Sequence, residues 1–242
     1  MTNPSRWAAA LVALGATALS AQAQRCEATS GPQQALLVEL YTSEGCNSCP
    51  PADRWLSMLK SRPEVLAAAF HVDYWDRLGW KDRFGSARFT ERQAEQQASS
   101  GAGFSYTPQV LVNGRDWRRW PALPAMAAAA AIVQIHLLRD NDQRVSVQVT
   151  PQPGAPARLA AWWALLEDGH VSAVKAGENS GVTLQHDHVV RAYGRQPAWA
   201  AAARHWPLDV PRRGEGGRAT RLLLVVTDGR SGAPLQAVQL GC

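Results

Sequence analysis

Two cysteines separated by two residues, Cys46 and Cys49, are the strongest chemical feature of the 242-residue sequence. A thiol pair at this spacing can form a reversible disulfide, form a structural one, or bind a metal ion. The neighbouring residues favour the first use. Residues 35–42 form an apolar run typical of a buried strand, and Pro50 and Pro51 are tolerated in the first turn of a helix. The pair therefore lies at a predicted strand-to-helix junction.

This junction predicts different roles for the two thiols. Cys46 would lie at the helix N-terminus, where the helix dipole and free backbone N–H groups favour a thiolate. We therefore predict that Cys46 is the nucleophile. Cys49, one turn deeper, would be the resolving thiol that attacks a mixed disulfide. A structural disulfide and a metal-binding pair remain the alternatives.

The first residues are typical of a secretory signal peptide. Arg6 precedes an apolar run at residues 7–19, and residues 21–23 (AQA) form a small-residue cleavage pattern. We predict a signal peptide over residues 1–23 and a periplasmic or secreted mature protein. The apolar run is shorter than the roughly 20 residues that a spanning helix needs, so no stable membrane anchor is expected after cleavage.

The two remaining cysteines lie near the ends of the mature chain. An oxidising compartment allows disulfides to persist. With Cys46 paired to Cys49, we predict a structural disulfide between Cys26 and Cys242. Closing so long a loop contributes on the order of 4 kcal/mol in the chain-entropy model.

Composition bounds the class of protein. The chain is 46% hydrophobic and 19% charged, which is typical of a folded globular protein. Its net charge is +5, but the lysines and arginines are scattered and form no basic stripe with interleaved aromatic residues. Nucleic acid is therefore not an expected partner.

Hydrophobic patterns predict alternating strands and helices in the first half and strands in the second. Asn113 and Gly114 form a two-residue hairpin signal. Residues 139–143 are expected to be a polar linker. In chain order, the first half has a helix from Pro50, a strand at 65–72, an aromatic loop at 73–85, a helix at 87–98, a strand at 110–112 and an alanine-rich helix at 124–138; the second half has strands at 145–150, 159–166, 222–227 and 235–240.

This order, with Thr107-Pro108 before the hairpin, resembles the thioredoxin superfamily. The resemblance implies that Pro108 forms a cis peptide bond beside the dithiol and that the backbone of Thr107 contacts an extended substrate. It also implies that Glu39 is a buried acid that assists the resolving thiol, although one more residue separates Glu39 from Cys46 than in the superfamily. Trp75, in the aromatic loop, is a candidate substrate contact, and packing of this loop against the C-terminal half is its other expected role.

Four segments carry a closer resemblance, to the bacterial exported family known as domain of unknown function 1223. The segments are VELYTSEGCNSCPPAD (residues 38–53), FHVDYWDRLGWKDRF (70–84), YTPQVLVNGR (106–115) and AGENSGVTLQHDHVVR (176–191). This resemblance implies a thioredoxin-like fold with a family-specific C-terminal part, and it brings no assigned reaction.

Together these patterns predict a fold and a function. The expected fold class is an α/β thioredoxin-like domain at residues 24–140, with a central mixed sheet and flanking helices. A small β-rich, sandwich-like domain at residues 144–242 is expected to follow. The expected function is a thiol-disulfide oxidoreductase that acts on a protein or small thiol or disulfide substrate and needs no organic cofactor.

Two other functions remain open. Cys46 and Cys49 could hold a soft metal such as Cu(I), with His71 as a third ligand. Alternatively, the protein could be a non-catalytic interaction domain with a structural disulfide. His186 and His188 would place two imidazoles on one face of a strand, suited to copper or zinc, but we favour surface histidines there and assign no metal site.

Overall fold

The computed structural model describes residues 26–125 and 129–242, so the predicted signal peptide lies outside the described residues. The described chain contains two α-helices, α1 (Pro50–Met58) and α2 (Ala87–Ser100), and three short 3-10 turns, η1 (Leu59–Ser61), η2 (Asp76–Leu78) and η3 (Glu215–Gly217). Its strands are β1 (Glu27–Thr29), β2 (Leu36–Thr42), β3 (Val65–His71), β4 (Gln109–Val112), β5 (Arg115–Asp116), β6 (Val133–Asn141), β7 (Arg144–Pro151), β8 (Arg158–Glu167), β9 (His170–Ala173), β10 (Thr183–His186), β11 (Val189–Ala200), β12 (Arg204–Asp209), β13 (Arg221–Asp228) and β14 (Pro234–Gly241).

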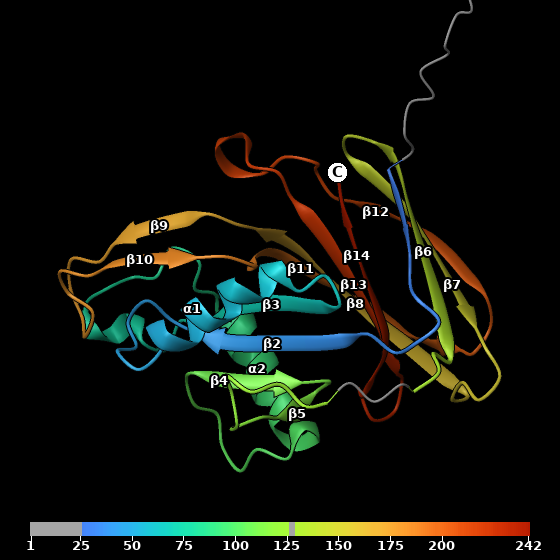
Figure 1. Ribbon diagram of the computed structural model, residues 1–242, viewed down its shortest axis with the longest axis horizontal. Coiled ribbons are helices and arrows are strands. Elements are labelled where there is room, and N and C mark those ends of the chain that lie inside the picture. Colours follow the sequence, from blue (N-terminus) through green and yellow to red (C-terminus); the bar gives the residue numbers. More distant parts are fainter. Residues whose placement is uncertain (1–25, 126–128) are drawn as a thin grey trace, which may run out of the picture.

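An eight-stranded sheet forms the centre of the molecule, in the order β14-β13-β8-β11-β3-β2-β4-β5 (Figure 1). Strand β3 is parallel to both β2 and β11, whereas the other neighbouring pairs are antiparallel. Every residue of β2 is buried, which explains its near-continuous apolar sequence. Because β11 lies beside β3, the sheet combines strands from both halves of the chain.

The expected α/β thioredoxin-like fold class is wrong. Strands account for 45% of the structure and helices for 15%, with only two α-helices in the described part of the chain. The local order around the cysteine pair, β2-α1-β3-α2-β4-β5, follows the sequence patterns. The pairing of β11 with β3 then extends the same sheet through β8, β13 and β14. The protein is therefore mostly β.

The helix predicted at residues 124–138 is also wrong, because β6 occupies Val133–Asn141. Val133, Ile135 and Leu137 alternate into the core, which is the period of a strand, whereas the alanines before them favour a helix by propensity alone. Residues 126–128 of this prediction lie outside the described residues. The expected linker at 139–143 is the end of β6 and the turn into β7, its antiparallel partner.

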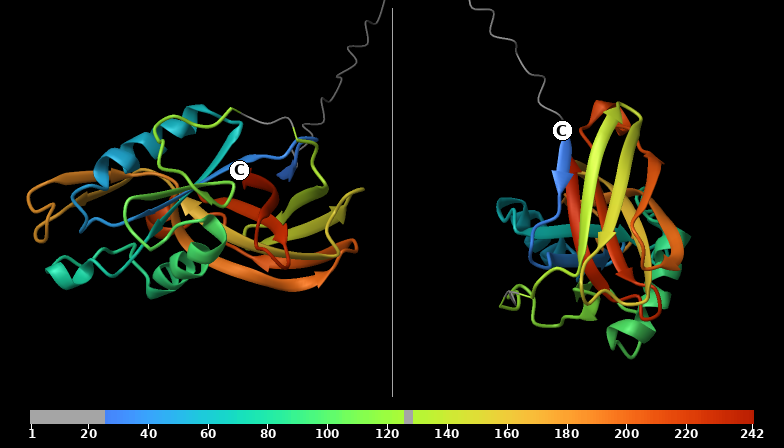
Figure 2. Two further views of the ribbon diagram at one scale, coloured as in Figure 1. Left: turned by 90° about the horizontal axis from the view of Figure 1, so that it is seen from below. Right: turned by 90° about the vertical axis from the view of Figure 1, so that its right-hand side faces the viewer.

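A four-stranded sheet, β1-β6-β7-β12, covers one end of the large sheet. The right-hand view of Figure 2 shows β6 and β7 lying against the red strands β13 and β14. Apolar side chains of both sheets form a common core, which includes Ile135, Val147, Leu222 and Leu224. A disulfide joins Cys26, beside β1, to Cys242, beside β14.

At the other end, the two helices cover opposite faces of the large sheet. Leu37 and Tyr41 of β2 share a core with Phe89 of α2, whereas Val38 and Leu40 pack with Trp55 and other residues of α1. The hairpin of β9 and β10 extends toward the end of the molecule where α1 begins, as Figure 1 shows, and β10 contacts α1. Within residues 26–125 and 129–242, no helix combines the length and apolar character needed to cross a membrane.

Candidate functional site

A disulfide joins Cys46 to Cys49 at the start of α1. Cys49 is the N-cap residue, and its carbonyl accepts hydrogen bonds from the N–H groups of Ala52 (2.9 Å) and Asp53 (3.1 Å). Cys46 follows the turn that leaves β2. Both cysteines are 0% exposed, although Asn47 and Ser48 between them are exposed. The disulfide is therefore covered by another part of the chain.

The cover is the β9–β10 loop, residues 174–182. The buried side-chain amide of Asn179 donates to the backbone carbonyls of Glu44 (2.8 Å) and Cys46 (2.9 Å). The exposed Glu178 carboxylate accepts a hydrogen bond from the N–H of Asn47 at 3.0 Å. These hydrogen bonds thus attach the loop to the backbone on both sides of Cys46.

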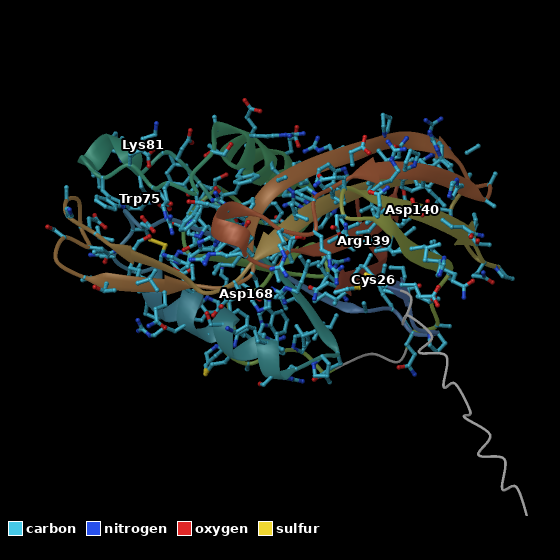
Figure 3. The ribbon with its side chains drawn as sticks, turned by 90° about the horizontal axis from the view of Figure 1, so that it is seen from above. Cys26, Trp75, Lys81, Arg139, Asp140 and Asp168 are labelled. Carbon is cyan, nitrogen blue, oxygen red and sulfur yellow. A yellow bond between two sulfur atoms is a disulfide. The ribbon has the colours of Figure 1, made fainter. Side chains whose placement is uncertain are left out.

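Trp75 and Thr107, two predicted substrate contacts, meet beside the same turn. The indole Nε1 of Trp75 donates to Thr107 Oγ1 at 2.8 Å, and the Thr107–Pro108 bond is cis. A Cβ atom at Gly45 would lie 2.9 Å from Trp75 Cβ, so this close approach requires glycine directly before Cys46. Figure 3 shows Trp75 and Lys81 at the end of the molecule opposite Cys26, Arg139 and Asp140.

Another residue of the aromatic loop packs against the β9–β10 loop, which belongs to the C-terminal half of the chain. A Cβ atom at Gly177 would lie 3.4 Å from Trp80 Cβ. Trp80 also donates from Nε1 to Glu44 Oε2 at 2.7 Å. The aromatic loop therefore contacts both the cover and the turn before Cys46.

Glu39 lies on the other face of the sheet. It shares the α2-facing side of β2 with Leu37 and Tyr41, and its Oε2 lies 2.5 Å from Nη2 of Arg92. Both side chains are 1% exposed. The cysteines lie at the start of α1, which covers the opposite face of the sheet. Glu39 therefore pairs with Arg92 and lies outside the site around the cysteines.

A group of buried ionisable residues lies near the disulfide, and we call it the acid–histidine cluster: Glu44, Asp53, His71, Asp82 and His186. Sequence reasoning considered His71 and His186 separately as metal ligands, and it missed Glu44, Asp53, Asp82 and the grouping itself. His71 Nδ1 lies 2.7 Å from Asp82 Oδ2, and His186 Nε2 lies 3.3 Å from Glu44 Oε1. Asp53 accepts a hydrogen bond from the Thr42 hydroxyl at 3.0 Å. The cluster combines residues of α1, β3, β10 and two loops.

Burial and ion pairing oppose each other in this cluster. Burial raises the pKa of Asp82, but contacts led by His71 outweigh it and hold that pKa at about 2. Burial lowers the pKa of His71, and Asp82 with the other nearby acids reverses the effect, so this pKa is above its ordinary value. Burial raises the pKa of Asp53. Burial also raises the pKa of Glu44, but hydrogen bonds led by His186 lower it below its ordinary value.

His186 and His188 do not share a strand face, and neither is a surface histidine. Strand β10 ends at His186, and His188 has a left-handed backbone with φ of 56°. The two residues are 2% and 3% exposed. The N–H of His188 donates to Asp168 Oδ1 at 2.7 Å, and burial followed by the charge of Arg221 lowers the pKa of its imidazole to about 4.

Part of this cluster could have been found from the sequence. Glu44 and Asp53 flank the cysteine pair, and His71 ends a predicted strand beside it, where the carboxyl ends of parallel strands collect functional groups. For His186 the sequence suggests only a pairing with His188, and no local signal places it beside Asp53 and His71. It reaches the cluster only because β10 lies across α1.

The fold and site thus define a mostly β protein with a covered two-cysteine disulfide above a buried acid–histidine cluster. The chain belongs to the family described as "Protein of unknown function (DUF1223)", whose model matches residues 37–227. No curated protein matches the chain in sequence.

Two solved structures share the fold. The crystal structure of protein AGR_C_4864 from Agrobacterium tumefaciens has a TM-score of 0.64 at 24% identity, covering 86% of this chain and 95% of that one. HBP35 of Porphyromonas gingivalis has a TM-score of 0.60 at 14% identity, covering 87% of this chain and 76% of that one. At these identities the likeness concerns the fold alone.

Proposed function

We propose that this protein is an exported thiol-disulfide oxidoreductase whose exchanging group is the Cys46–Cys49 disulfide. The observation that carries the proposal is the position of this disulfide, closed across two exposed residues at the N-terminus of α1. A thiolate formed there is stabilised by the helix dipole, which makes the sulfur a good leaving group and a reactive nucleophile. The proposed substrate is a protein or small molecule that carries thiols or a disulfide.

The exchange needs no other reactant than the substrate dithiol. One substrate thiolate attacks Sγ of Cys46, the Cys46–Cys49 bond breaks, and Cys49 leaves as a thiolate. The second substrate thiolate then attacks the substrate sulfur of the mixed disulfide and releases Cys46. Two electrons pass from the substrate to the protein, and the reverse sequence reduces a substrate disulfide.

Access to the sulfur atoms requires the β9–β10 loop to move. Both cysteines are buried, and Asn179 fastens the loop to the backbone of Glu44 and Cys46. Together with the hydrogen bond from the Asn47 N–H to Glu178, these are three hydrogen bonds between a loop and a turn, so a local opening can break them without unfolding either sheet. Trp75 and Thr107, both half-buried beside Gly45, offer the surface on which we place the substrate.

A structural disulfide is the second candidate, and the burial of Cys46 and Cys49 favours it. A disulfide that stays covered cannot meet a substrate thiol. In that case the loop around Asn179 would protect a bond that only braces the start of α1.

The redox equilibrium of Cys46–Cys49 with glutathione separates these candidates. Thiol trapping and peptide mass spectrometry on the mature protein report each cysteine pair separately, so the Cys26–Cys242 disulfide serves as an internal reference. A Cys46→Ser variant provides the control in which the exchanging pair is absent. We expect a potential between about −120 and −270 mV, the range of exchange catalysts. A potential below about −300 mV, or reduction only on unfolding, would mean a structural disulfide.

A further inference from the structure

We propose that Asp53, His71 and His186 bind a first-row divalent transition-metal ion directly behind the Cys46–Cys49 disulfide. One ligand atom from each of the three side chains lies within 4.8 Å of the other two, and all three residues are buried. The residues come from α1, the end of β3 and the end of β10. Neither cysteine is part of this group.

A carboxylate hydrogen-bonds one nitrogen of His71, as is usual for metal-binding histidines, and a second carboxylate lies near His186. Each has a carboxylate against one ring nitrogen: Asp82 Oδ2 lies 2.7 Å from His71 Nδ1, and Glu44 Oε1 lies 3.3 Å from His186 Nε2. In metal sites such carboxylates fix the ring and increase the basicity of the other nitrogen. His71 Nε2 and both ring nitrogens of His186 have no hydrogen-bond partner among the described residues.

Unpartnered nitrogens at this depth need an explanation. The side chains of His71 and His186 are 0% and 1% exposed. A buried polar atom without a partner costs on the order of 1–3 kcal/mol, so native structures satisfy nearly all of them. A metal ion between the rings would accept one lone pair from His71 and one from His186, and it would remove this cost for those two nitrogens.

The charge of the surroundings also favours a cation. Three buried carboxylates, Glu44, Asp53 and Asp82, lie in the acid–histidine cluster. Within the described chain, no lysine or arginine forms an ion pair with any of them. Buried acids are costly unless they are paired or coordinate a metal. Among the described residues, the only possible cations paired with these three carboxylates are two histidines, so a divalent ion would add positive charge to a group rich in acids.

The donor set selects the kind of metal. Imidazole nitrogens with a carboxylate oxygen suit zinc and neighbouring first-row ions, whereas calcium and magnesium prefer oxygen ligands alone. Ligand atoms around a tetrahedral zinc ion lie about 3.3 Å apart, so the three side chains would close inward on binding. The ion would then fasten β10 to α1 and β3, beneath the loop that covers the disulfide.

Zinc binding by the oxidised mature protein tests this site. Both disulfides are kept closed and any free thiol is blocked, so the cysteines cannot contribute ligands. The protein is refolded with Zn²⁺, dialysed, and assayed for metal by mass spectrometry. We expect one zinc ion per chain, no retention of Ca²⁺ or Mg²⁺, and loss of zinc in Asp53→Asn, His71→Gln and His186→Gln.

Two histidines outside the group provide matched controls. His205→Gln replaces an exposed histidine and His188→Gln a buried one, and both variants should keep the ion. Because a cluster variant could fail to fold, wild-type protein loaded with Co²⁺ provides a second readout. Its visible spectrum should show nitrogen and oxygen ligands in a low-symmetry site. Refolding without zinc uptake, or zinc retained in His71→Gln and His186→Gln, would overturn the proposal.

The test is independent of the proposed exchange chemistry. Zinc uptake is measured with the Cys46–Cys49 disulfide intact, whereas the redox potential is measured on metal-free protein. If the ion holds β10 over the disulfide, bound zinc should slow the reduction of Cys46–Cys49 at least several-fold, and the His186→Gln variant should lose this effect.

Discussion

The two faces of the large sheet bury charge in different ways. On the α2 face, Glu39 and Arg92 form a single ion pair, and the guanidinium lies 4.2 Å from the ring centre of Phe70 and 4.7 Å from that of Trp162. On the α1 face, the acid–histidine cluster gathers three carboxylates and two imidazoles next to the disulfide. The first group pairs one cation with one anion, and the second is rich in acids.

This difference separates a structural group from a candidate functional one. Opposite charges in one pair offset the cost of burial, and aromatic rings surround the cation. In the acid–histidine cluster, three ring nitrogens have no hydrogen-bond partner in the described chain, and the group lies near a covered disulfide. Natural proteins tolerate such locally unfavourable arrangements mainly where function requires them.

The largest effect is expected from breaking the ion pair on the α2 face. Arg92→Ala leaves the Glu39 carboxylate buried without a partner and removes the contacts with Phe70 and Trp162. We expect the free energy of unfolding to fall by about 3–5 kcal/mol, measured by urea denaturation. The redox potential of Cys46–Cys49 should not change, because Glu39 faces away from α1.

Two further variants sharpen this result. Arg54→Ala removes an exposed arginine of α1 and should change stability by less than about 0.5 kcal/mol. The double variant Glu39→Leu with Arg92→Leu removes both charges and should recover much of the loss, because no unpaired charge remains. A loss below about 1 kcal/mol in Arg92→Ala would mean that Glu39 has another partner or is neutral.

The elements around the disulfide could be predicted because their signals are local. Strands β2 and β3 are buried on both faces, so each is a continuous apolar run, and Gly101 ends α2 with a left-handed φ of 82°. Cys46, Cys49 and Trp75 lie in or beside these elements. The secondary structure around these three residues could therefore be predicted from short stretches of sequence.

The rest depends on contacts between distant residues. Val189 of β11 pairs with Ala69 of β3, and no local sequence pattern indicates that pairing. A prediction that lacks this strand pairing treats the two halves of the chain as separate domains. The burial of His186 and its place in the acid–histidine cluster were missed for the same reason, since they require the β9–β10 hairpin to lie across α1. Strand β6 was missed because alanine propensity outweighed the alternation of Val133, Ile135 and Leu137.

A smaller effect is expected on the α1 face, where Asn179 fastens the cover. Asn179→Ala leaves the carbonyls of Glu44 and Cys46 without their donor, which costs the closed loop about 1–3 kcal/mol. We expect dithiothreitol to reduce Cys46–Cys49 roughly ten- to a hundred-fold faster, while the unfolding of the two sheets changes little. Trapping the free thiols at successive times after mixing measures the rate of reduction.

Gln185→Ala is the matched control, because Gln185 is exposed on β10 and its substitution leaves the Asn179 contacts intact. Its reduction rate should equal that of the wild type. Equal rates in Asn179→Ala and the control would show that the loop does not limit access to the disulfide, and a different opening would have to expose Cys46.

The smallest effect concerns a partly exposed acid at the edge of the sheet, beside the segment that carries Pro108. Tyr106 and Gln109 donate hydrogen bonds to Asp116 Oδ1 at 2.7 and 3.1 Å. Burial raises the pKa of Asp116, but hydrogen bonds led by that from Tyr106 outweigh it and lower the pKa below 3.8. Asp116 therefore stabilises the fold fully above its unfolded pKa, and the contribution is lost as the pH falls through its folded-state pKa.

Tyr106→Phe isolates this contribution. It removes the strongest donor to Asp116, so the carboxyl pKa should rise toward its ordinary value, as measured by NMR titration. The acid side of the stability profile should then become shallower, because the folded and unfolded pKa values of Asp116 are closer together. The shift should be modest, since the remaining contacts of Asp116 include the exposed Arg118. An unchanged Asp116 pKa in Tyr106→Phe would mean that Gln109 and Arg118 alone hold the carboxylate, and that the Tyr106 hydroxyl contributes nothing to the charge at this edge of the sheet.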